Sequence, residues 1–413
     1  MLTRHNLGTK EVEAPRSKAR GSSLVVSFTL ACIVLAAINL RPALTSIATM
    51  LTEIQQGLGL NGVWIGILTT MPVLCFGIFG PFAPLLSARL GLERAIALLF
   101  MSLAAGLALR LVPQSAALFA STLLAGAAIG MAGVLLPVVI RRRFPTRLGP
   151  MTGLYTMILS VGGASAAGLT PVFERAWQSW TLALAIWSIP ALVAALLWSG
   201  LASSETATTG TAPLPRFSLL LRDRLAWYVT AFMGLQAGLA FIVLGWLPTL
   251  LRDRGLDVLD AGIVTSVSIL AQTVTALLVP SLATQRVSPR LLIVLVLSAT
   301  CIGFLGLIYA PLSTRIPWAV ILGLGQGGLF GLALLFITLR APTAEMTAML
   351  SGMSQSIGYL GASLCPFAVG LLKAGHDPFT GPAIMVVAVT AACTWCGLKA
   401  AAPGYVLPHL RSS

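Results

Sequence analysis

Residues 153–165 read GLYTMILSVGGAS, and residues 352–363 read GMSQSIGYLGAS. Residues 153–164 and 352–363 align without a gap at an offset of 199 residues. A shared offset over distant parts of a chain predicts two copies of one structural unit in parallel orientation, an arrangement found in membrane transporters. Four pairs of residues share this offset: Gly126 and Gly325, Gly153 and Gly352, Gly162 and Gly361, and Pro81 and Pro280. The first span departs from it, because Pro42 aligns with Pro248 at an offset of 206.

The composition predicts a protein that spans a membrane many times. Of the 413 residues, 57% are hydrophobic and only 9% are charged, and the mean hydropathy is +0.93. A soluble domain carries about 25% charged residues, so this chain could not cover its surface in water. A soluble enzyme is therefore excluded as a class.

Apolar stretches recur along the chain between short polar breaks. Each is near or above the ~20 residues that a helix needs to cross a bilayer. They are continuous rather than alternating, which indicates helices and not a β-barrel. The predicted spans are 24–51, 63–86, 94–112, 115–140, 149–172, 181–201, 224–250, 258–283, 289–311, 316–340, 346–372 and 380–402.

The longest polar stretch inside the chain divides these twelve spans into two sets of six. We expect an all-α polytopic membrane protein in which two pseudo-symmetric six-helix bundles pack together. The expected divisions are a cytoplasmic N-terminal tail (1–22), an N-terminal bundle (23–201), a cytoplasmic linker (202–223), a C-terminal bundle (224–402) and a cytoplasmic C-terminal tail (403–413).

The placement of the basic residues predicts the orientation. With the N-terminus inside the cell, 19 of the 26 Lys and Arg residues lie in inside segments and five in outside segments. The positive-inside rule therefore places both termini in the cytoplasm. The same asymmetry explains the net charge of +14 without any nucleic-acid partner.

No set of residues suited to catalysis or metal binding is visible. The three His residues lie in tails or an outer loop, and the six Cys residues lie in apolar spans, where packing is the expected role. All twelve acidic residues lie in tails, in loops or near span ends. Proton-coupled carriers usually place an ionisable residue deep in the membrane, so we expect no side-chain proton relay here. Participation of Glu345 or Asp260, at helix starts, is the alternative.

Arg41 lies deep in the first predicted span. It stands 17 residues after Leu24, which corresponds to about 25 Å along a helix. Pro42 follows and weakens the local backbone hydrogen bonding. An Arg in hydrocarbon costs at least about 2.5–3.5 kcal/mol, and no intramembrane carboxylate is available to pair with it. We therefore expect Arg41 to face a cavity and to bind an anionic or strongly dipolar substrate. Snorkelling to the outer surface is the alternative for Arg41, and it is the interpretation that we favour for Arg110, near the outer end of the third span.

Uncharged polar residues in other spans could complete such a cavity. Such groups join helices at least as often as they bind ligands, but together with Arg41 they favour a small polar site. The candidate substrate-binding residues are Arg41, Asn39, Thr45, Tyr155, Gln236, Gln272, Gln326, Gln355 and Tyr359.

Several motifs resemble the cyanate porter (CynX/NimT-type) branch of the major facilitator superfamily. These are INLRPAL at 38–44, RRRFP at 141–145, WLPTLL at 246–251, LGLGQG at 322–327 and LSGMSQSIGYLGA at 350–362, with GLYT at 153–156. The likeness covers most of the chain and implies a twelve-helix transporter fold. It also implies a substrate such as cyanate or a nitroimidazole.

The chain departs from the usual superfamily pattern at two places. The loop after the second span usually carries Asp-Arg-x-Gly-Arg, but here Ala88 replaces the acid while Arg89 and Gly91 match. The fourth span lacks the Arg that many proton-coupled relatives carry. Both departures are unlike a standard proton antiporter.

We expect a secondary transporter that moves a small anion or compact polar molecule, such as cyanate, by alternating access with Arg41 as the central anchor. Efflux of small aromatic drugs such as nitroimidazoles is the alternative, and a membrane sensor or scaffold is disfavoured because the loops and tails look too short. The expected partners are a small-molecule substrate and the lipid bilayer, with no nucleic acid, no cofactor and no metal. We expect a monomer in the plasma (inner) membrane.

Overall fold

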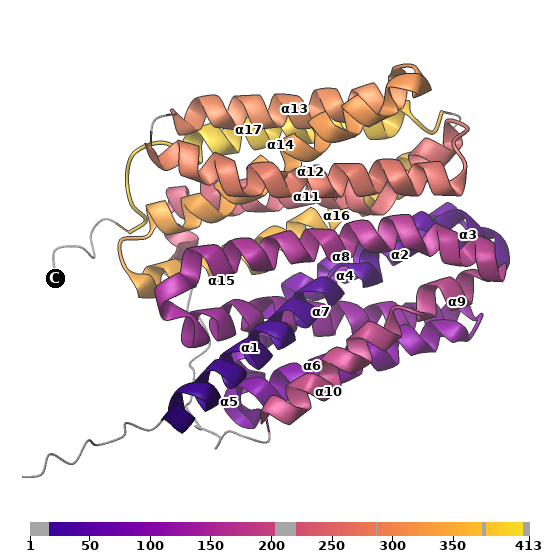
Figure 1. Ribbon diagram of the computed structural model, residues 1–413. Coiled ribbons are helices and arrows are strands. Elements are labelled where there is room, and N and C mark those ends of the chain that lie inside the picture. Colours follow the sequence, from indigo (N-terminus) through magenta and orange to yellow (C-terminus); the bar gives the residue numbers. More distant parts are fainter. Residues whose placement is uncertain (1–15, 203–219, 286, 374–376, 408–413) are drawn as a thin grey trace, which may run out of the picture.

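The computed structural model describes residues 16–202, 220–285, 287–373 and 377–407, and regular structure in these ranges is helical (Figure 1). Twelve of its helical stretches are long and apolar enough to cross a membrane, which confirms the predicted spans. Most of the expected N-terminal tail and linker, and half of the expected C-terminal tail, lie outside the described residues.

The described first half contains ten α-helices. Nine of them, with two short 3-10 turns that extend them, form the first six spans, and the remaining one, at residues 51–58, follows the first span. Several spans consist of consecutive helical pieces. In chain order the pieces are α1 (Arg16–Asn39), α2 (Pro42–Thr49), α3 (Leu51–Leu58), α4 (Gly62–Phe79), η1 (Gly80–Phe82), α5 (Ala83–Leu90), α6 (Leu92–Ala108), η2 (Leu109–Leu111), α7 (Ser115–Arg143), α8 (Leu148–Trp177), α9 (Trp180–Ala185) and α10 (Ser188–Ala202).

The second six spans are less interrupted. Their helices are α11 (Arg224–Asp253), α12 (Val258–Gln285), α13 (Pro289–Tyr309), α14 (Arg315–Arg340), α15 (Ala344–Ala362), α16 (Leu364–Lys373) and α17 (Thr380–Ala400). Proline in corresponding spans has different effects in the two halves. The first span is broken at Pro42, whereas α11 continues through Pro248.

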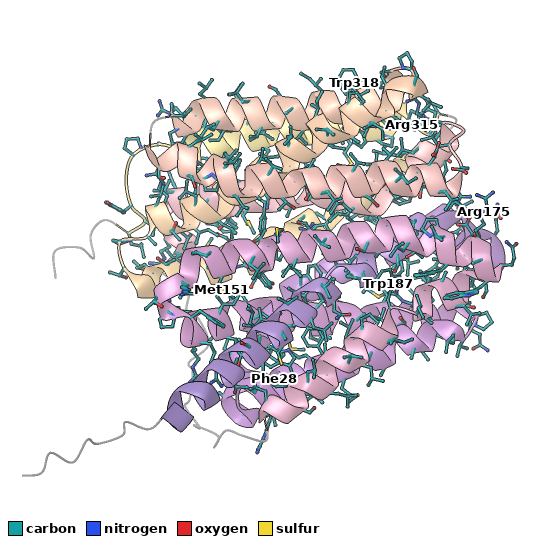
Figure 2. The ribbon with its side chains drawn as sticks, viewed as in Figure 1. Phe28, Met151, Arg175, Trp187, Arg315 and Trp318 are labelled. Carbon is teal, nitrogen blue, oxygen red and sulfur yellow. The ribbon has the colours of Figure 1, made fainter. Side chains whose placement is uncertain are left out.

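The helices lie side by side, and α1 begins on the same side of the molecule on which α17 ends (Figure 1). We call this the terminal side and the opposite one the far side. Arg175, at the end of α8, and Arg315, at the start of α14, mark the far side (Figure 2). Large apolar side chains such as Phe28 are exposed on the outward surface, as a lipid environment requires.

The buried apolar residues form two main clusters. One lies within the first half, around Phe100, Leu136 and Trp198. The other fills the second half and extends into the far-side end of the first half, where Met50 and Ile54 join it. The two halves therefore share a hydrophobic core toward the far side.

Candidate functional site

The centre of the site is the break in the first span. Pro42 has no backbone N–H and begins α2, so Arg41 lies between two helices as the residue that precedes α2. The N–H of Leu40 donates a hydrogen bond to the carbonyl of Ala37 at 3.2 Å, which tightens the last turn of α1. The carbonyl of Arg41 accepts hydrogen bonds from the N–H groups of Leu44 and Thr45. The hydrogen-bond ladder therefore restarts at Arg41.

The side chain of Arg41 lies between the two halves of the molecule. A methyl group added to Gly163 of α8 would lie 3.1 Å from Cδ of Arg41 and 3.6 Å from Cγ2 of Ile269 in α12. Glycine at this position thus lets the arginine pass close to α8, beside a helix of the second half. The Nη1 atom of Arg41 is fully buried and has no hydrogen-bond partner among the described residues.

Two tyrosines approach the Arg41 guanidinium from opposite halves. Tyr155 of α8 and Tyr359 of α15 lie close enough for their hydroxyl groups to interact electrostatically with Arg41. These hydroxyls can donate to a bound anion or accept from a polar ligand. Of the candidate residues, the structure therefore brings together Arg41, Tyr155 and Tyr359.

Two further aromatic side chains pack next to Tyr359 of this site. The ring centroid of Tyr359 lies 6.1 Å from that of Phe76 in α4 and 6.2 Å from that of Phe241 in α11. Phe76 and Phe241 are 5.9 Å apart, so three rings from three helices form a triangle. These separations lie within the range of favourable aromatic contacts.

A small cavity of about 20 Å³ lies between α2, α4 and α11. Its lining is almost entirely apolar, and Phe241 connects it to the three-ring cluster. The lining residues are Leu44, Ile47, Ala48, Leu68, Thr69, Pro72, Phe241, Leu244 and Gly245.

Asn39 contacts α10 and makes no hydrogen bond to Arg41 among the described residues. Its amide donates to the carbonyls of Leu35, at 2.7 Å, and Pro190, at 3.1 Å, and so fastens α1 to α10. Thr45 is buried, and its hydroxyl donates a hydrogen bond to the carbonyl of Arg41 at 3.2 Å. The donors of both side chains thus bond to backbone carbonyls at or beside the helix break, and a role of Asn39 and Thr45 in binding stays a prediction.

The four glutamines make no hydrogen bond to Arg41 among the described residues. Gln236 donates to the carbonyl and sulfur of Met233, and Gln355 donates to the hydroxyl of Ser351 at 2.7 Å. Gln272 is buried in α12, and Nε2 of Gln326 is buried in α14 without a partner in the described part of the chain. Their role in binding stays a prediction.

The expectation for Arg110 is wrong. Instead of snorkelling outward, its side chain is 1% exposed and bonds to polar groups inside the first half. Sequence position near a span end does not tell which face of the helix a residue occupies. Phe76 and Phe241 were also missed, because apolar residues in apolar spans carry no distinguishing signal.

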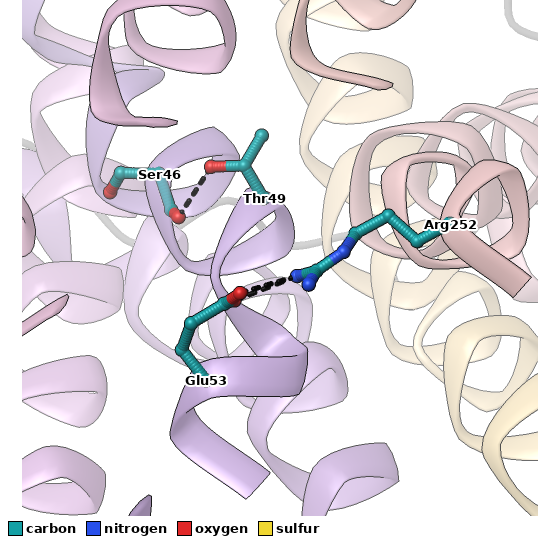
Figure 3. A network of polar contacts seen from close by, with 4 residues as sticks. All are labelled: Ser46, Thr49, Glu53 and Arg252. Carbon is teal, nitrogen blue, oxygen red and sulfur yellow. Dashed lines mark hydrogen bonds and ion pairs between the residues drawn. The ribbon is translucent and has the colours of Figure 1, made fainter. Parts of the chain in front are cut away.

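An ion pair joins the two halves on the far side. Nη1 of Arg252, at the end of α11, lies 2.7 and 2.8 Å from the two carboxylate oxygens of Glu53 in α3 (Figure 3). Glu174, at the end of α8, interacts electrostatically with both residues. We call Glu53 and Arg252 the far-side latch.

On the terminal side, the described ion pair lies within one half. Arg143, at the end of α7, bonds to the carboxylate of Glu93, at the start of α6, at 3.3 Å. Glu93 thus supplies a carboxylate near the loop in which Ala88 replaces the usual acid. This pair fastens α6 to α7 and does not join the two halves.

Comparison with known proteins agrees with this architecture. The sequence matches the Major Facilitator Superfamily over residues 26–366. Among solved structures, the D-xylose-proton symporter superimposes with a TM-score of 0.72 at 14% identity, covering 91% of this chain and 97% of that one. The nucleoside transporter NupG gives 0.68 at 16% identity, covering 91% and 98%. At these identities the likeness concerns the fold.

Three bacterial relatives are similar over most of their length. The uncharacterized transporter YycB of Bacillus subtilis (strain 168) is 36% identical over 86% of this chain and 89% of its own. The 2-nitroimidazole transporter of Escherichia coli (strain K12) is 32% identical over 87% and 91%. The cyanate transport protein CynX of the same organism is 31% identical over 83% and 89%.

The twelve candidate membrane spans among the described residues, the family match and the relatives identify a multi-pass membrane transporter rather than an enzyme. The chain belongs to the Major Facilitator Superfamily, and its similarity to the cyanate and 2-nitroimidazole transporters confirms the resemblance seen in its motifs.

Proposed function

We propose that this transporter carries a small anion or compact polar molecule, with cyanate as the example, and that Arg41 is the central anchor. The observation that carries the proposal is the buried Nη1 of Arg41, which has no partner among the described residues. A buried N–H group without a partner is unfavourable, so a ligand that accepts its hydrogen bonds is bound preferentially. The planar guanidinium suits a small planar anion or a strong dipole.

Alternating access is the proposed mechanism. The terminal-side piece of the first span, α1, packs mainly on α7, α8 and α10 of its own half, whereas α2 also packs on α11 of the other half. The shared core and the far-side latch support a state closed on the far side. Rocking of the halves about Arg41 would then open one side at a time.

The proposed setting is the plasma membrane, with a monomer whose terminal side faces the cytoplasm. The charge distribution supports this orientation, because Arg141, Arg142 and Arg143 cluster at the terminal-side end of α7. The described acidic residues lie at or near helix ends, which supports carriage without an acidic relay at the midplane.

Export of planar aromatic compounds such as nitroimidazoles is the second candidate. It is favoured by the three-ring cluster of Phe76, Phe241 and Tyr359 and by the apolar cavity beside it. A neutral planar ring can stack on such side chains without needing a positive charge. Under this candidate, Phe241→Ala weakens binding more than Arg41→Gln does.

Ligand-dependent thermal stabilisation of the purified protein separates the two candidates. A ligand at about 100 times its Kd stabilises the folded state by about 2.7 kcal/mol. We expect cyanate to raise the Tm of the wild type, and Arg41→Gln to weaken its binding about ten- to hundredfold, since a hydrogen bond to a charged group contributes about 1.5–3 kcal/mol. Arg41→Lys keeps the charge but loses the planar fork, and should retain part of the response.

Arg315→Gln is the matched control, because Arg315 pairs with Asp260 at the far-side surface, away from the site. This variant should respond to cyanate as the wild type does. The proposal fails if no anion stabilises the wild type, or if Arg41→Gln responds equally. Stabilisation by 2-nitroimidazole that survives Arg41→Gln would support the second candidate.

A further inference from the structure

Arg110 is a second buried cation in the first half, and it has no carboxylate partner among the described residues. Its guanidinium donates three hydrogen bonds to neutral groups. Nε donates to the hydroxyl of Ser121 in α7 at 3.1 Å, Nη1 to the hydroxyl of Ser46 in α2 at 3.2 Å, and Nη2 to the carbonyl of Ala43 in α2 at 2.9 Å. Two of the three bonds therefore reach α2.

Helix α2 is interrupted at both ends. At its start the hydrogen-bond ladder restarts at Arg41, and at its end Met50 leaves the helical conformation before α3 begins. The hydroxyl of Thr49 donates to the carbonyl of Ser46 at 2.9 Å, within this last turn (Figure 3). The backbone alone thus fixes the direction of α2 weakly, and side-chain contacts must do so.

We propose that Arg110 is a positioning residue that fastens α2 to α7 and thereby holds the Arg41 guanidinium in the transport site. Ala43 lies two residues after Arg41, so the bond from Nη2 acts close to the anchor. The proposal rests on the proposed role of Arg41 in binding.

The chemistry explains why an arginine occupies this place. A guanidinium presents donors in a rigid fork and can bond to three acceptors on two helices at once. A lysine has a single nitrogen on a flexible stem and could not reach all three with good geometry. Burial of the charge is costly, and the three hydrogen bonds offset part of that cost.

The first test is a double-mutant cycle between Arg110 and Arg41, read as the Kd of cyanate and of 2-nitroimidazole. In the wild-type background we expect Arg110→Gln to weaken cyanate binding about tenfold, because small misplacements of a binding group are costly. In the Arg41→Gln background the same change should alter the Kd by less than about twofold. Arg110→Lys should restore part of the affinity.

Milder variants guard against a general loss of folding. Ser46→Ala removes one bond on the α2 side and should weaken cyanate binding by a smaller factor than Arg110→Gln. Thr122→Val is the matched control, because Thr122 adjoins Ser121, is equally buried and bonds only to its own helix, at the carbonyl of Leu118. It should leave the Kd unchanged.

The second test reports on α2 without any substrate. Leu44 lies in α2 and lines the cavity, so the labelling rate of Leu44→Cys by an anionic thiosulfonate reagent follows the position of α2. Five of the six native cysteines are buried, and the parent protein provides the background rate. We expect Arg110→Gln to change this rate several-fold, and Thr122→Val to leave it unchanged.

Independent effects of the two arginines on binding, together with an unchanged labelling rate, would overturn the proposal. If Arg41→Gln does not affect binding, the proposed function has failed, and the labelling rate alone decides whether Arg110 positions α2. A changed rate then supports this role of Arg110, and an unchanged rate rejects it.

Discussion

Gly162 and Gly361 occupy equivalent positions in the two repeats but have different surroundings. A methyl group on Gly162 would lie 2.1 Å from the carbonyl oxygen of Ile38, so α8 touches the backbone of α1 just before the break at Arg41. No atom lies within 4 Å of the corresponding position on Gly361. The repeat is therefore preserved in sequence where its packing has diverged.

We predict that Gly162→Ala destabilises the protein by about 1–3 kcal/mol, because the contacting atoms belong to a backbone and cannot rotate away. The melting temperature of the purified variant measures this. Gly361→Ala is the matched control and should be neutral or slightly stabilising, since Ala favours helix over Gly by up to about 1 kcal/mol. Equal melting temperatures for the two variants would contradict the close approach of α1 and α8.

At the same scale, the sequence pointed to Arg41 and to the two tyrosines that lie near it, Tyr155 and Tyr359, but not to Phe76 and Phe241. Arg41 could be found because a charge beside a proline deep in an apolar span is unusual. The contact of Asn39 with α10 could not be predicted, because its neighbours in α1 do not reveal which helix it faces. Arg110 was misassigned because Ser46 and Ala43, its partners in α2, are more than 60 residues away in the chain.

At the scale of elements, the segment from α2 to α3 connects the site to the far-side latch. Arg41 precedes α2, and Glu53 lies in α3, immediately after the second interruption. Pro42 indicated the first interruption. The second, at Met50, has no proline, and α11 continues through Pro248, so proline alone does not predict where spans break.

We predict that Arg252→Gln loosens the far-side latch. The pair is partly exposed, and such pairs contribute about 0.2–1 kcal/mol, so the population open on the far side should rise by up to about fivefold. A membrane-impermeant thiol reagent applied to Ala48→Cys, which lines the cavity, measures the change as a labelling rate. Arg252 is preferred to Glu53 because Glu174 offers a second carboxylate nearby.

Lys373→Gln is the control for this experiment. It breaks a pair of similar exposure between Lys373 and Asp253, which lies within the second half and on the same side. Labelling should stay at its original rate in this variant. The latch assignment is wrong if Lys373→Gln and Arg252→Gln have equal effects, or if the charge-swapped pair Glu53→Arg with Arg252→Glu does not restore slow labelling.

At the scale of the whole molecule, the shared core on the far side distinguishes the two sides of the transporter. Residues of α2 and α3 join the cluster of the second half, including Leu247 and Leu250 of α11. The twelve spans follow from hydropathy alone, which is why they could be predicted from the sequence. The contacts between the two halves on the far side could not, since they depend on how helices that are distant in the chain pack together.

The net charge of the transported species decides how the whole molecule responds to voltage. If cyanate crosses as an anion without a coupled ion, an inside-negative potential of about 100 mV costs about 2.3 kcal/mol and lowers its inside-to-outside ratio about fiftyfold. Proteoliposomes with an imposed potassium diffusion potential measure this ratio. A ratio that does not change with voltage would show electroneutral carriage instead.

The most direct measurement is uptake of labelled cyanate into liposomes that contain equal amounts of the folded wild type, Arg41→Lys or Arg41→Gln. If Arg41 is the anchor, Arg41→Gln lowers uptake at limiting cyanate by about tenfold or more, and Arg41→Lys keeps an intermediate rate. Uptake by Arg41→Gln at the wild-type rate would contradict the account.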